Sequence, residues 1–238
     1  REIRKAFLAD EGSVLMAYDY SQIELRLLAH LADVTQLIDA FNNNVDIHSQ
    51  TAKDVFHLEE VTSNDRSLAK AVNFGIIYGI SDFGLSEQLG ISRSEAKEYI
   101  DRYLSTYPEI QKYMDNVIAQ CEDDGYVKTI INRRREIPEI KSSNFMVRSF
   151  GKRAAMNAPI QGSAADLIKI AMVRIDKRIK DNNLQSKMLL QVHDELIFNV
   201  VESEIDLMKK IIEEEMNDAM TIKVPLISEG SMAKDWYS

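Results

Sequence analysis

Two aspartates in apolar stretches are the residues of this sequence best suited to metal chemistry. In LLQVHDELIFNV, residues 189–200, His193, Asp194 and Glu195 interrupt two apolar, β-prone runs. A carboxylate taken out of water without a partner is strongly destabilised or becomes protonated. The stretch therefore predicts either a solvated hairpin turn or a hairpin tip that offers oxygen ligands to a cation such as Mg²⁺.

The second carboxylate is Asp19, which interrupts the apolar stretch LMAYDY. If both stretches are strands of one sheet, Asp19 and Asp194 could share two divalent cations. Such a pair, about 3.5–4 Å apart, holds the attacking and leaving oxygens of a phosphoryl transfer. The alternative is that Asp19 only precedes a helix N-terminus, where a negative charge is favourable. The sequence alone leaves both interpretations open.

A stripe of cations and aromatic rings is expected on the helix that follows. In DRSLAKAVNFGIIYG, Arg66, Lys70, Phe74 and Tyr78 recur every four residues. At 3.6 residues per turn they drift by only about 120° over about 18 Å. Cations near a helix N-terminus favour an anion, and the rings beyond them suit a sugar and a base. The stripe indicates a nucleotide site, and the alternative is an amphipathic helix with a solvated basic face.

Composition bounds the class of protein. The 238 residues are 45% hydrophobic, enough for a sizeable core, and the single Cys121 forms no internal disulfide. No apolar run approaches the roughly 20 residues of a membrane span. The opening REIRKAF lacks a Met, and we expect a cut inside a longer protein.

The charge is uneven along the chain. The net charge of −9 argues against a general polyanion binder, but residues 128–153 hold eight Lys/Arg against two Asp/Glu. Residues 194–238 hold eleven acidic residues against four basic ones. This pattern suits a polyanion on one side and cations on another, and a solvated basic loop is the alternative.

The expected elements cluster by type, with strands at both ends and helices between them. This order predicts an α+β fold, an antiparallel sheet built from both ends with a helical insertion over about 44–150. Ser21 and Glu24 fit a capping box. Strands are expected at 14–19, 126–131, 187–201 (a hairpin) and 222–229, with a basic turn at 133–135, and helices at about 21–31, 34–42, 48–57, 63–78, 92–106, 108–125, 143–156, 163–182 and 205–219.

Four motifs, taken together and in order, resemble those of family A DNA polymerases, the bacterial DNA polymerase I group. They are DYSQIELR at 19–26, RSLAKAVNFGIIYG at 66–79, RAAMNAPIQGSAAD at 153–166 and QVHDE at 191–195. The resemblance covers nearly the whole chain. It implies an antiparallel palm sheet with flanking helices and a mostly helical fingers insertion, without a thumb; residues 1–43 and 151–238 would be palm, and 44–150 fingers.

The resemblance also implies roles for single residues. Two Mg²⁺ ions, which Mn²⁺ could replace, would be bound by Asp19, Asp194 and the backbone carbonyl of Tyr20. Glu195 would assist catalysis near the metals, and Lys70 would donate a proton to pyrophosphate. The dNTP would contact Gln22, Glu24, His48, Arg66, Lys70, Phe74 and Tyr78, and the primer–template DNA would contact Arg153, Asn157, Gln161 and His193, with Gln22 facing it as well.

Glu24 has two interpretations. As a gate against a ribose 2′-hydroxyl it would hydrogen-bond a tyrosine, with Tyr78 the candidate. As a capping-box residue it would bond the backbone of Ser21.

The function implied is template-directed DNA synthesis from dNTPs on a primer 3′-OH, in DNA replication or repair. We expect a monomer in the cytoplasm at the nucleoid, without a membrane, although a phage or organelle origin stays open. A fragment without its thumb is expected to be weakly active. The rivals are a single-subunit RNA polymerase, a non-catalytic nucleic-acid-binding module and a two-metal nuclease.

Overall fold

The computed structural model describes residues 2–236 and has the predicted α+β architecture. Two compact units make up the chain, and each is described by itself. The sheet unit comprises Arg1–Ile23, Ala164–Thr221 and Pro225–Ser238, and the helical unit comprises Glu24–Ser163 and Ile222–Val224.

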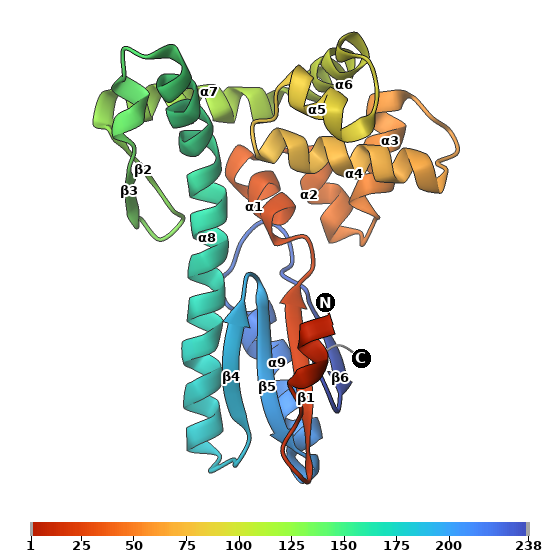
Figure 1. Ribbon diagram of the computed structural model, residues 1–238, viewed down its shortest axis with the longest axis vertical. Coiled ribbons are helices and arrows are strands. Elements are labelled where there is room, and N and C mark those ends of the chain that lie inside the picture. Colours follow the sequence, from red (N-terminus) through yellow and green to blue (C-terminus); the bar gives the residue numbers. More distant parts are fainter. Residues whose placement is uncertain (1, 237–238) are drawn as a thin grey trace. The chain divides into compact units, whose positions relative to one another are not determined.

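The sheet unit is built on four antiparallel strands in the order β4-β5-β1-β6 (Figure 1). The predictions that one strand comes from the start of the chain, and that it shares a sheet with a hairpin near the end, are confirmed. The strands are β1 (Ser13–Tyr20), β4 (Lys187–Val192), β5 (Glu195–Val201) and β6 (Ser228–Ala233).

The last strand lies further along the chain than expected. It was predicted at 222–229, but β6 is Ser228–Ala233. Pro225 interrupts the apolar run and has no N–H to offer a sheet ladder. Ile222–Val224 instead belong to the helical unit.

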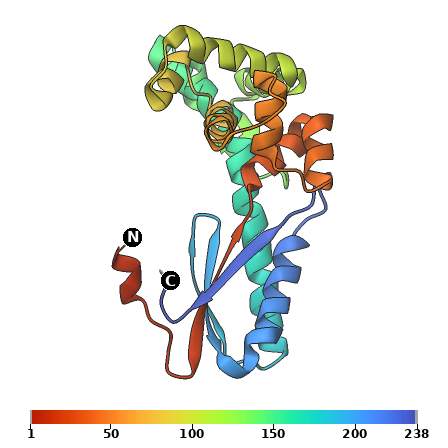
Figure 2. The same ribbon diagram turned by 90° about the vertical axis from the view of Figure 1, so that its right-hand side faces the viewer.

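One face of the sheet packs on α9 (Ile205–Asn217) and the C-terminal half of α8, which Figure 2 shows on the same side of the strands. The Tyr18 hydroxyl donates to Glu213 (3.2 Å) and the Tyr20 hydroxyl to the Met216 carbonyl (2.8 Å). Since successive side chains of a strand alternate between faces, the odd-numbered residues of β1 point away from α9.

Gly230 is required by the packing of this covered face. It lies opposite Tyr18 in the β1–β6 ladder, and a Cβ built on it would stand 2.3 Å from the tyrosine ring. Any side chain at Gly230 would displace that ring.

The helical unit contains the helices that precede the hairpin. Within one or two residues, the helices predicted at 34–42, 48–57, 63–78, 92–106 and 108–125 are confirmed. The elements are α1 (Ile23–Ala32), α2 (Thr35–Asn42), α3 (Ile47–Phe56), α4 (Ser63–Ile77), α5 (Asp82–Leu89), α6 (Arg93–Thr106), α7 (Pro108–Asp124), β2 (Tyr126–Lys128), β3 (Arg134–Glu136) and the N-terminal half of α8 (Phe145–Asp181), with short 3₁₀ turns η1 (Glu2–Ala6), η2 (Pro138–Lys141) and, in the sheet unit, η3 (Glu202–Glu204).

Two short features of this unit were not expected. Helix α5 begins after Ser81, whose hydroxyl accepts from the Gly84 N–H, and ends at Gly90 in the left-handed region (φ 66°). The prediction of a basic turn at 133–135 was wrong in part, because Arg134 and Arg135 pair with β2. The preceding strand accordingly stops at Lys128, short of the expected Ile131.

Helix α8 is continuous, whereas two helices were predicted with a break between 156 and 163. Pro159 lies inside it. Proline removes one backbone donor and disfavours a helix interior. Buried neighbours Ala155, Ala158 and Ile160 offset this cost through packing. Among residues 2–236, no helix is long and apolar enough to cross a membrane.

Candidate functional site

Three carboxylates form a row across one face of the sheet. Asp19 is opposite Glu195 of β5 on one side and opposite Glu229 of β6 on the other. Directly opposed residues of an antiparallel ladder point to the same face. Because Tyr18 and Tyr20 contact α9, this face is the one turned away from α9. The sheet therefore brings the two predicted carboxylate segments together.

Asp194 lies beside this row, in the two-residue loop between β4 and β5. The loop is His193–Asp194, closed by the pair Val192–Glu195. His193 has φ 57°, an uncommon conformation for a residue with a Cβ, and the Gln191 amide donates to its carbonyl (2.8 Å). This tight loop keeps Asp194 next to Glu195.

The carboxylates repel one another. Partial burial first, and then repulsion from Asp194, Glu229 and Glu195, raise the pKa of Asp19 above its ordinary value. Carboxylate oxygens are hard ligands of the kind that a divalent cation prefers. Among residues 2–236, no three or more His, Cys, Asp or Glu side chains are arranged to hold a metal ion. The metal prediction thus rests on the aspartate pair and a backbone carbonyl.

One cation of the sheet unit contacts the row. The Arg4 guanidinium lies 3.5 Å from Glu195 and 4.2 Å from the centre of the Trp236 ring. The same ring meets Phe7 edge-on at 5.6 Å. Arg4 thereby offsets part of the negative charge at the Glu195 end of the row.

In the helical unit, α4 presents the predicted stripe. Its N-terminus is fixed by a capping box between Thr62 and Asp65. Arg66, Lys70 and Tyr78 are exposed and Phe74 is half-buried, while Ala69, Val72, Ile76 and Ile77 face the core. Arg66, Lys70 and Tyr78 are therefore accessible to a ligand, and Phe74 is accessible in part.

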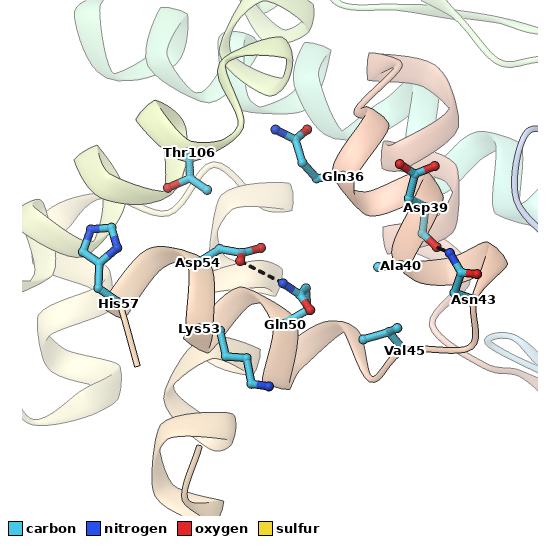
Figure 3. A pocket seen from close by; sticks show the side chains of 10 residues that line it. All are labelled: Gln36, Asp39, Ala40, Asn43, Val45, Gln50, Lys53, Asp54, His57 and Thr106. Atoms are coloured by element: carbon cyan, nitrogen blue, oxygen red, sulfur yellow. Dashed lines mark hydrogen bonds between the residues drawn. The ribbon is translucent and has the colours of Figure 1, made fainter. Parts of the chain in front are cut away.

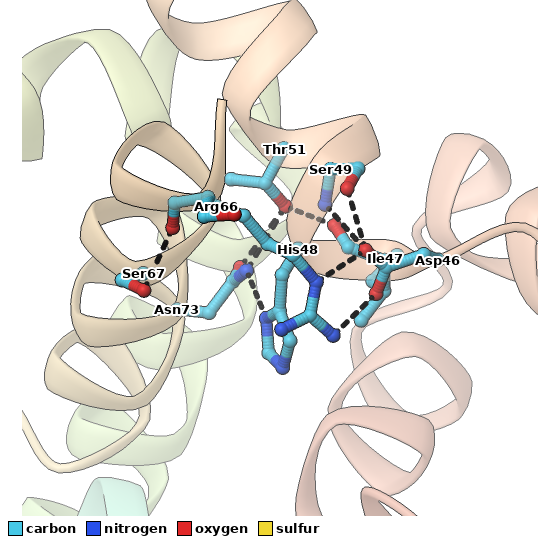
Figure 4. Close-up of polar contacts among 9 residues, drawn as sticks. Asp46, Ile47, His48, Ser49, Thr51, Arg66, Ser67 and Asn73 are labelled. Carbon is cyan, nitrogen blue, oxygen red and sulfur yellow. Dashed lines mark hydrogen bonds and ion pairs between the residues drawn. The ribbon is translucent and has the colours of Figure 1, made fainter. Parts of the chain in front are cut away.

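Arg66 is held by a carboxylate of the neighbouring helix. Its Nε and Nη2 donate to Asp46 at 2.7 and 3.1 Å (Figure 4). Asp46 also caps α3, accepting from the Ser49 backbone N–H and hydroxyl. Burial alone would raise the pKa of Asp46, but the hydrogen bonds from Arg66 and Ser49 lower it to about 2. The ion pair fixes the guanidinium at the start of the stripe.

His48 follows the same cap and is buried. Figure 4 shows its ring between α3 and α4, with Nδ1 3.2 Å from the Asn73 amide nitrogen. Its ring centre is 5.9 Å from that of Phe74. Burial, together with the Arg66 and Lys70 charges and against the opposing effect of Asp46, lowers the pKa of His48 to about 4. The side chain is therefore neutral at pH 7.

Glu24 pairs with the tyrosine expected for it. The Tyr78 hydroxyl donates to Glu24 Oε2 at 2.6 Å, and the Tyr78 and Phe74 rings stack at 6.5 Å. The predicted helix start at Ser21 is displaced, because α1 begins at Ile23. Phe74, Tyr78 and Arg153 line part of a pocket of about 440 Å³. The helical unit thus brings Glu24, His48, Arg66, Lys70, Phe74 and Tyr78 onto one region.

The predicted primer–template residues fall into both units. Arg153, Asn157 and Gln161 follow one another at four-residue spacing on α8, and Arg153 and Gln161 are exposed. Asn157 Oδ1 is buried and has no hydrogen-bond partner among residues 2–236. Gln22, with φ 55°, joins β1 to α1, and His193 is exposed on the hairpin loop.

A separate, larger pocket of about 720 Å³ lies along α2 and α3 (Figure 3). Gln50, Lys53, Asp54 and His57 line it, and the Gln50 amide donates to Asp54 at 2.8 Å. It contains none of the residues expected to act in catalysis or binding.

The sequence did not predict three residues that lie at the carboxylate row or beside the stripe. Asp46 could have been found, because an Asp just before a helix with a Ser three residues later is typical of a helix N-cap. Asn73 was a polar residue on the expected core face of its helix, which is itself informative. Glu229 gave no local pattern, because its position opposite Asp19 depends on the β1–β6 register.

The model of DNA polymerase family A matches residues 1–238. The chain belongs to this family. DNA polymerase I of Streptococcus pneumoniae is 54% identical over 241 residues, covering 100% of this chain and 28% of that protein. DNA polymerase I of Geobacillus stearothermophilus is 50% identical over 240 residues, covering 100% and 27%. The chain thus spans little more than a quarter of these relatives.

A solved structure has the same fold. The POL domain of Pol1 from M. smegmatis, in complex with DNA primer-template and dNTP, matches with a TM-score of 0.94 and 45% identity. The match covers 98% of this chain and 42% of that chain.

Proposed function

We propose that this chain is the palm and fingers part of a template-directed DNA polymerase. It would transfer a nucleotidyl group from a dNTP to a primer 3′-OH and release pyrophosphate. The observation that carries the proposal is the position of Asp19, opposite Glu195 and next to Asp194 in one sheet. Family membership and the DNA- and dNTP-bound M. smegmatis relative support it.

The carboxylates would hold divalent metal ions. Asp19, Asp194 and the Tyr20 carbonyl are the expected ligands of two Mg²⁺, with Mn²⁺ as a substitute, and the mutual repulsion of the carboxylates favours cation binding. When bound, the ions would supply positive charge that favours the deprotonated primer hydroxyl and neutralises the leaving pyrophosphate. Glu195, paired with Arg4, would assist beside them.

The stripe on α4 would bind the nucleotide. Arg66 and Lys70, with His48 beside them, would bind the triphosphate, because charge-assisted hydrogen bonds to phosphate are strong. Lys70 would also donate a proton to the leaving pyrophosphate. Phe74 would pack on the sugar and base, and Tyr78 would lie by the templating base.

Glu24 would exclude a ribose 2′-hydroxyl. Its carboxylate is held by the tyrosine hydroxyl at 2.6 Å, which fits a fixed gate. The primer–template would contact Gln22 and also Arg153, Asn157, Gln161 and His193.

At the level of the whole molecule, residues 1–43 and 151–238 would be palm and 44–150 fingers. We expect a monomer that works on DNA in the cytoplasm, at the nucleoid, in replication or repair. We also expect this fragment to be weakly active unless a thumb grips the duplex.

A primer-extension assay tests the proposal. The fragment, and a longer protein that includes the upstream sequence of a relative, would be given primer–template, Mg²⁺ and either dNTPs or NTPs. We expect extension with dNTPs that is lost in Asp19→Ala and Asp194→Ala and kept in the exposed control Glu11→Gln. Preference for NTPs would indicate an RNA polymerase. Salt-dependent DNA binding that survives Asp19→Ala, with no extension by either protein at any Mg²⁺ concentration, would indicate a binding module.

A further inference from the structure

The buried face of α4 carries one polar side chain among apolar ones. Asn73 is 0% exposed and lies between the buried Val72 and Ile76. Across from it, on α3, Thr51 is 0% and His48 is 2% exposed. An amide buried without hydrogen bonds is costly, so buried polar side chains are normally paired. We therefore expect specific partners for the amide of Asn73.

The hydroxyl of Thr51 reaches both ends of the amide, the Asn73 nitrogen at 3.0 Å and the Asn73 oxygen at 3.2 Å. Its proton goes to the nearer acceptor, the Ile47 carbonyl at 2.8 Å, which leaves the hydroxyl oxygen as an acceptor (Figure 4). The Asn73 amide nitrogen, at 3.0 Å, donates to it. The second hydrogen of that nitrogen is then directed to His48 Nδ1 at 3.2 Å. A neutral imidazole whose Nδ1 accepts carries its proton on Nε2.

The charges around the ring keep it neutral. Asp46, at the cap of α3, favours the imidazolium, but burial and the Arg66 and Lys70 cations of α4 oppose it more strongly. Ring packing against Phe74 fixes the plane of the imidazole next to the stripe. His48 is therefore a neutral ring with a single donor, Nε2–H.

We propose that Asn73 is a positioning residue that sets the tautomer of His48, so that a neutral Nε2–H is offered to a phosphate of the incoming nucleotide. This inference rests on the proposed function, since it takes the stripe on α4 as the triphosphate site. In the other tautomer Nε2 is a lone pair, which repels a phosphate oxygen. The amide therefore decides whether His48 attracts or repels the ligand.

The tautomer can be measured on the unaltered protein. Long-range ¹H–¹⁵N spectra of protein labelled at its four histidines distinguish Nε2–H, Nδ1–H and imidazolium forms. His48→Gln assigns the signal. We expect the Nε2–H form at pH 7, and Asn73→Asp, whose carboxylate accepts from Nδ1–H, should place a proton on Nδ1, as the neutral Nδ1–H form at pH 8 and increasingly as the imidazolium toward pH 6. An Nδ1–H or imidazolium form in the wild type would overturn the proposal.

Binding of inorganic tripolyphosphate, by calorimetry, measures the consequence. Asn73→Leu leaves the ring free to turn and to change tautomer, so the contact of Nε2–H with phosphate is lost and binding should weaken about tenfold. In Asn73→Asp the affinity should rise as pH falls from 8 to 6, by more than in wild type. The control Ser163→Ala removes a buried acceptor of the Ile130 N–H, elsewhere in the unit, and should stay within about twofold of wild type. Equal affinities for Asn73→Leu and wild type would contradict the proposal.

The result separates this inference from the proposed function. An Nε2–H tautomer that Asn73→Asp changes, in a wild type that binds neither tripolyphosphate nor dATP with Mg²⁺, would overturn the nucleotide site and keep the assignment of the tautomer to Asn73. Tight binding with the Nδ1–H tautomer would overturn the role of Asn73 and keep the nucleotide site.

Discussion

Replacing Asp19 by Asn should make the metal-free protein more stable. Like charges directly opposite one another in an antiparallel sheet cost roughly 0.2–1 kcal/mol each. Asp19 faces two such partners, Glu195 and Glu229, and Asp194 repels it as well. Asp19 is exposed, and screening by solvent brings the sum to about 1 kcal/mol. For a protein of this size that raises Tm by about 2–4 °C.

The gain should depend on pH with a defined sign. The pKa of Asp19 is raised in the folded state, so the folded protein binds this proton more tightly than the unfolded chain. Near the ordinary Asp value of 3.8 or below, the carboxyl is protonated and the repulsion is absent. The cost appears as pH rises through the folded pKa. The Tm difference between Asp19→Asn and wild type should therefore be full at pH 8 and shrink on acidification.

Mg²⁺ should reverse the order of stability. At about ten times its Kd, a ligand that binds only the folded state adds about 1.4 kcal/mol, or about 3–6 °C here. Wild type should gain this amount, and Asp19→Asn should gain much less because it lacks a ligand.

The assay is thermal denaturation in chelator and then in a Mg²⁺ titration, with Glu11→Gln as a control that removes one exposed negative charge outside the row. We expect this control to follow wild type in both conditions. Equal Tm values for Asp19→Asn and wild type without metal, or the same Mg²⁺ shift in both proteins, would refute the shared site.

Three further substitutions test other contacts. Asp46→Asn keeps the helix cap but loses the ion pair with Arg66, which should lower the free energy of unfolding by about 0.5 kcal/mol at pH 7. Because the folded pKa of Asp46 is lowered to about 2, the difference in stability from wild type should vanish as pH falls from about 4 toward 2. A difference in urea midpoint that persists at pH 2 would contradict the assignment. Gly230→Ala should lower Tm by about 4–8 °C, since overpacking against the Tyr18 ring costs about 2 kcal/mol, and an unchanged Tm would show that the ring moves freely. Glu24→Ala should raise the ratio of ribonucleotide to deoxynucleotide incorporation about tenfold in primer extension by the longer protein, whereas an unchanged ratio would leave only a structural role.

The sequence predicted those elements whose local patterns agree with the tertiary structure. Apolar, β-prone runs defined β1 and the hairpin, and the capping residues Thr62 and Ser92 lie at the starts of α4 and α6. It failed where packing overrides local preference. Pro159 suggests a helix end, yet buried neighbours keep α8 continuous. Pro225 lies inside the strand predicted at 222–229, where the apolar residues alone favoured a strand, and the observed strand β6 begins only at Ser228.

The residues of the site also divide into those that the sequence alone reveals and those that only the fold reveals. Asp19, Asp194 and the stripe from Arg66 to Tyr78 are recognisable because their residue types and spacing are unusual by themselves. Glu229 became visible only with the strand register, and Asn73 only with the contact between α3 and α4. A residue that acts through another side chain leaves little trace in the sequence around it.

The continuity of α8 has a consequence for which changes the segment 153–161 tolerates. Arg153, Asn157 and Gln161 are separated by four residues each, so they stay within about 80° of one line over about 12 Å. Adding a single amino acid between Asn157 and Gln161 would turn the glutamine by about 100° and advance it by about 1.5 Å, while every residue stayed helical. Homologous chains should therefore keep the length of this segment, because an insertion would move Gln161 out of line with Arg153 and Asn157.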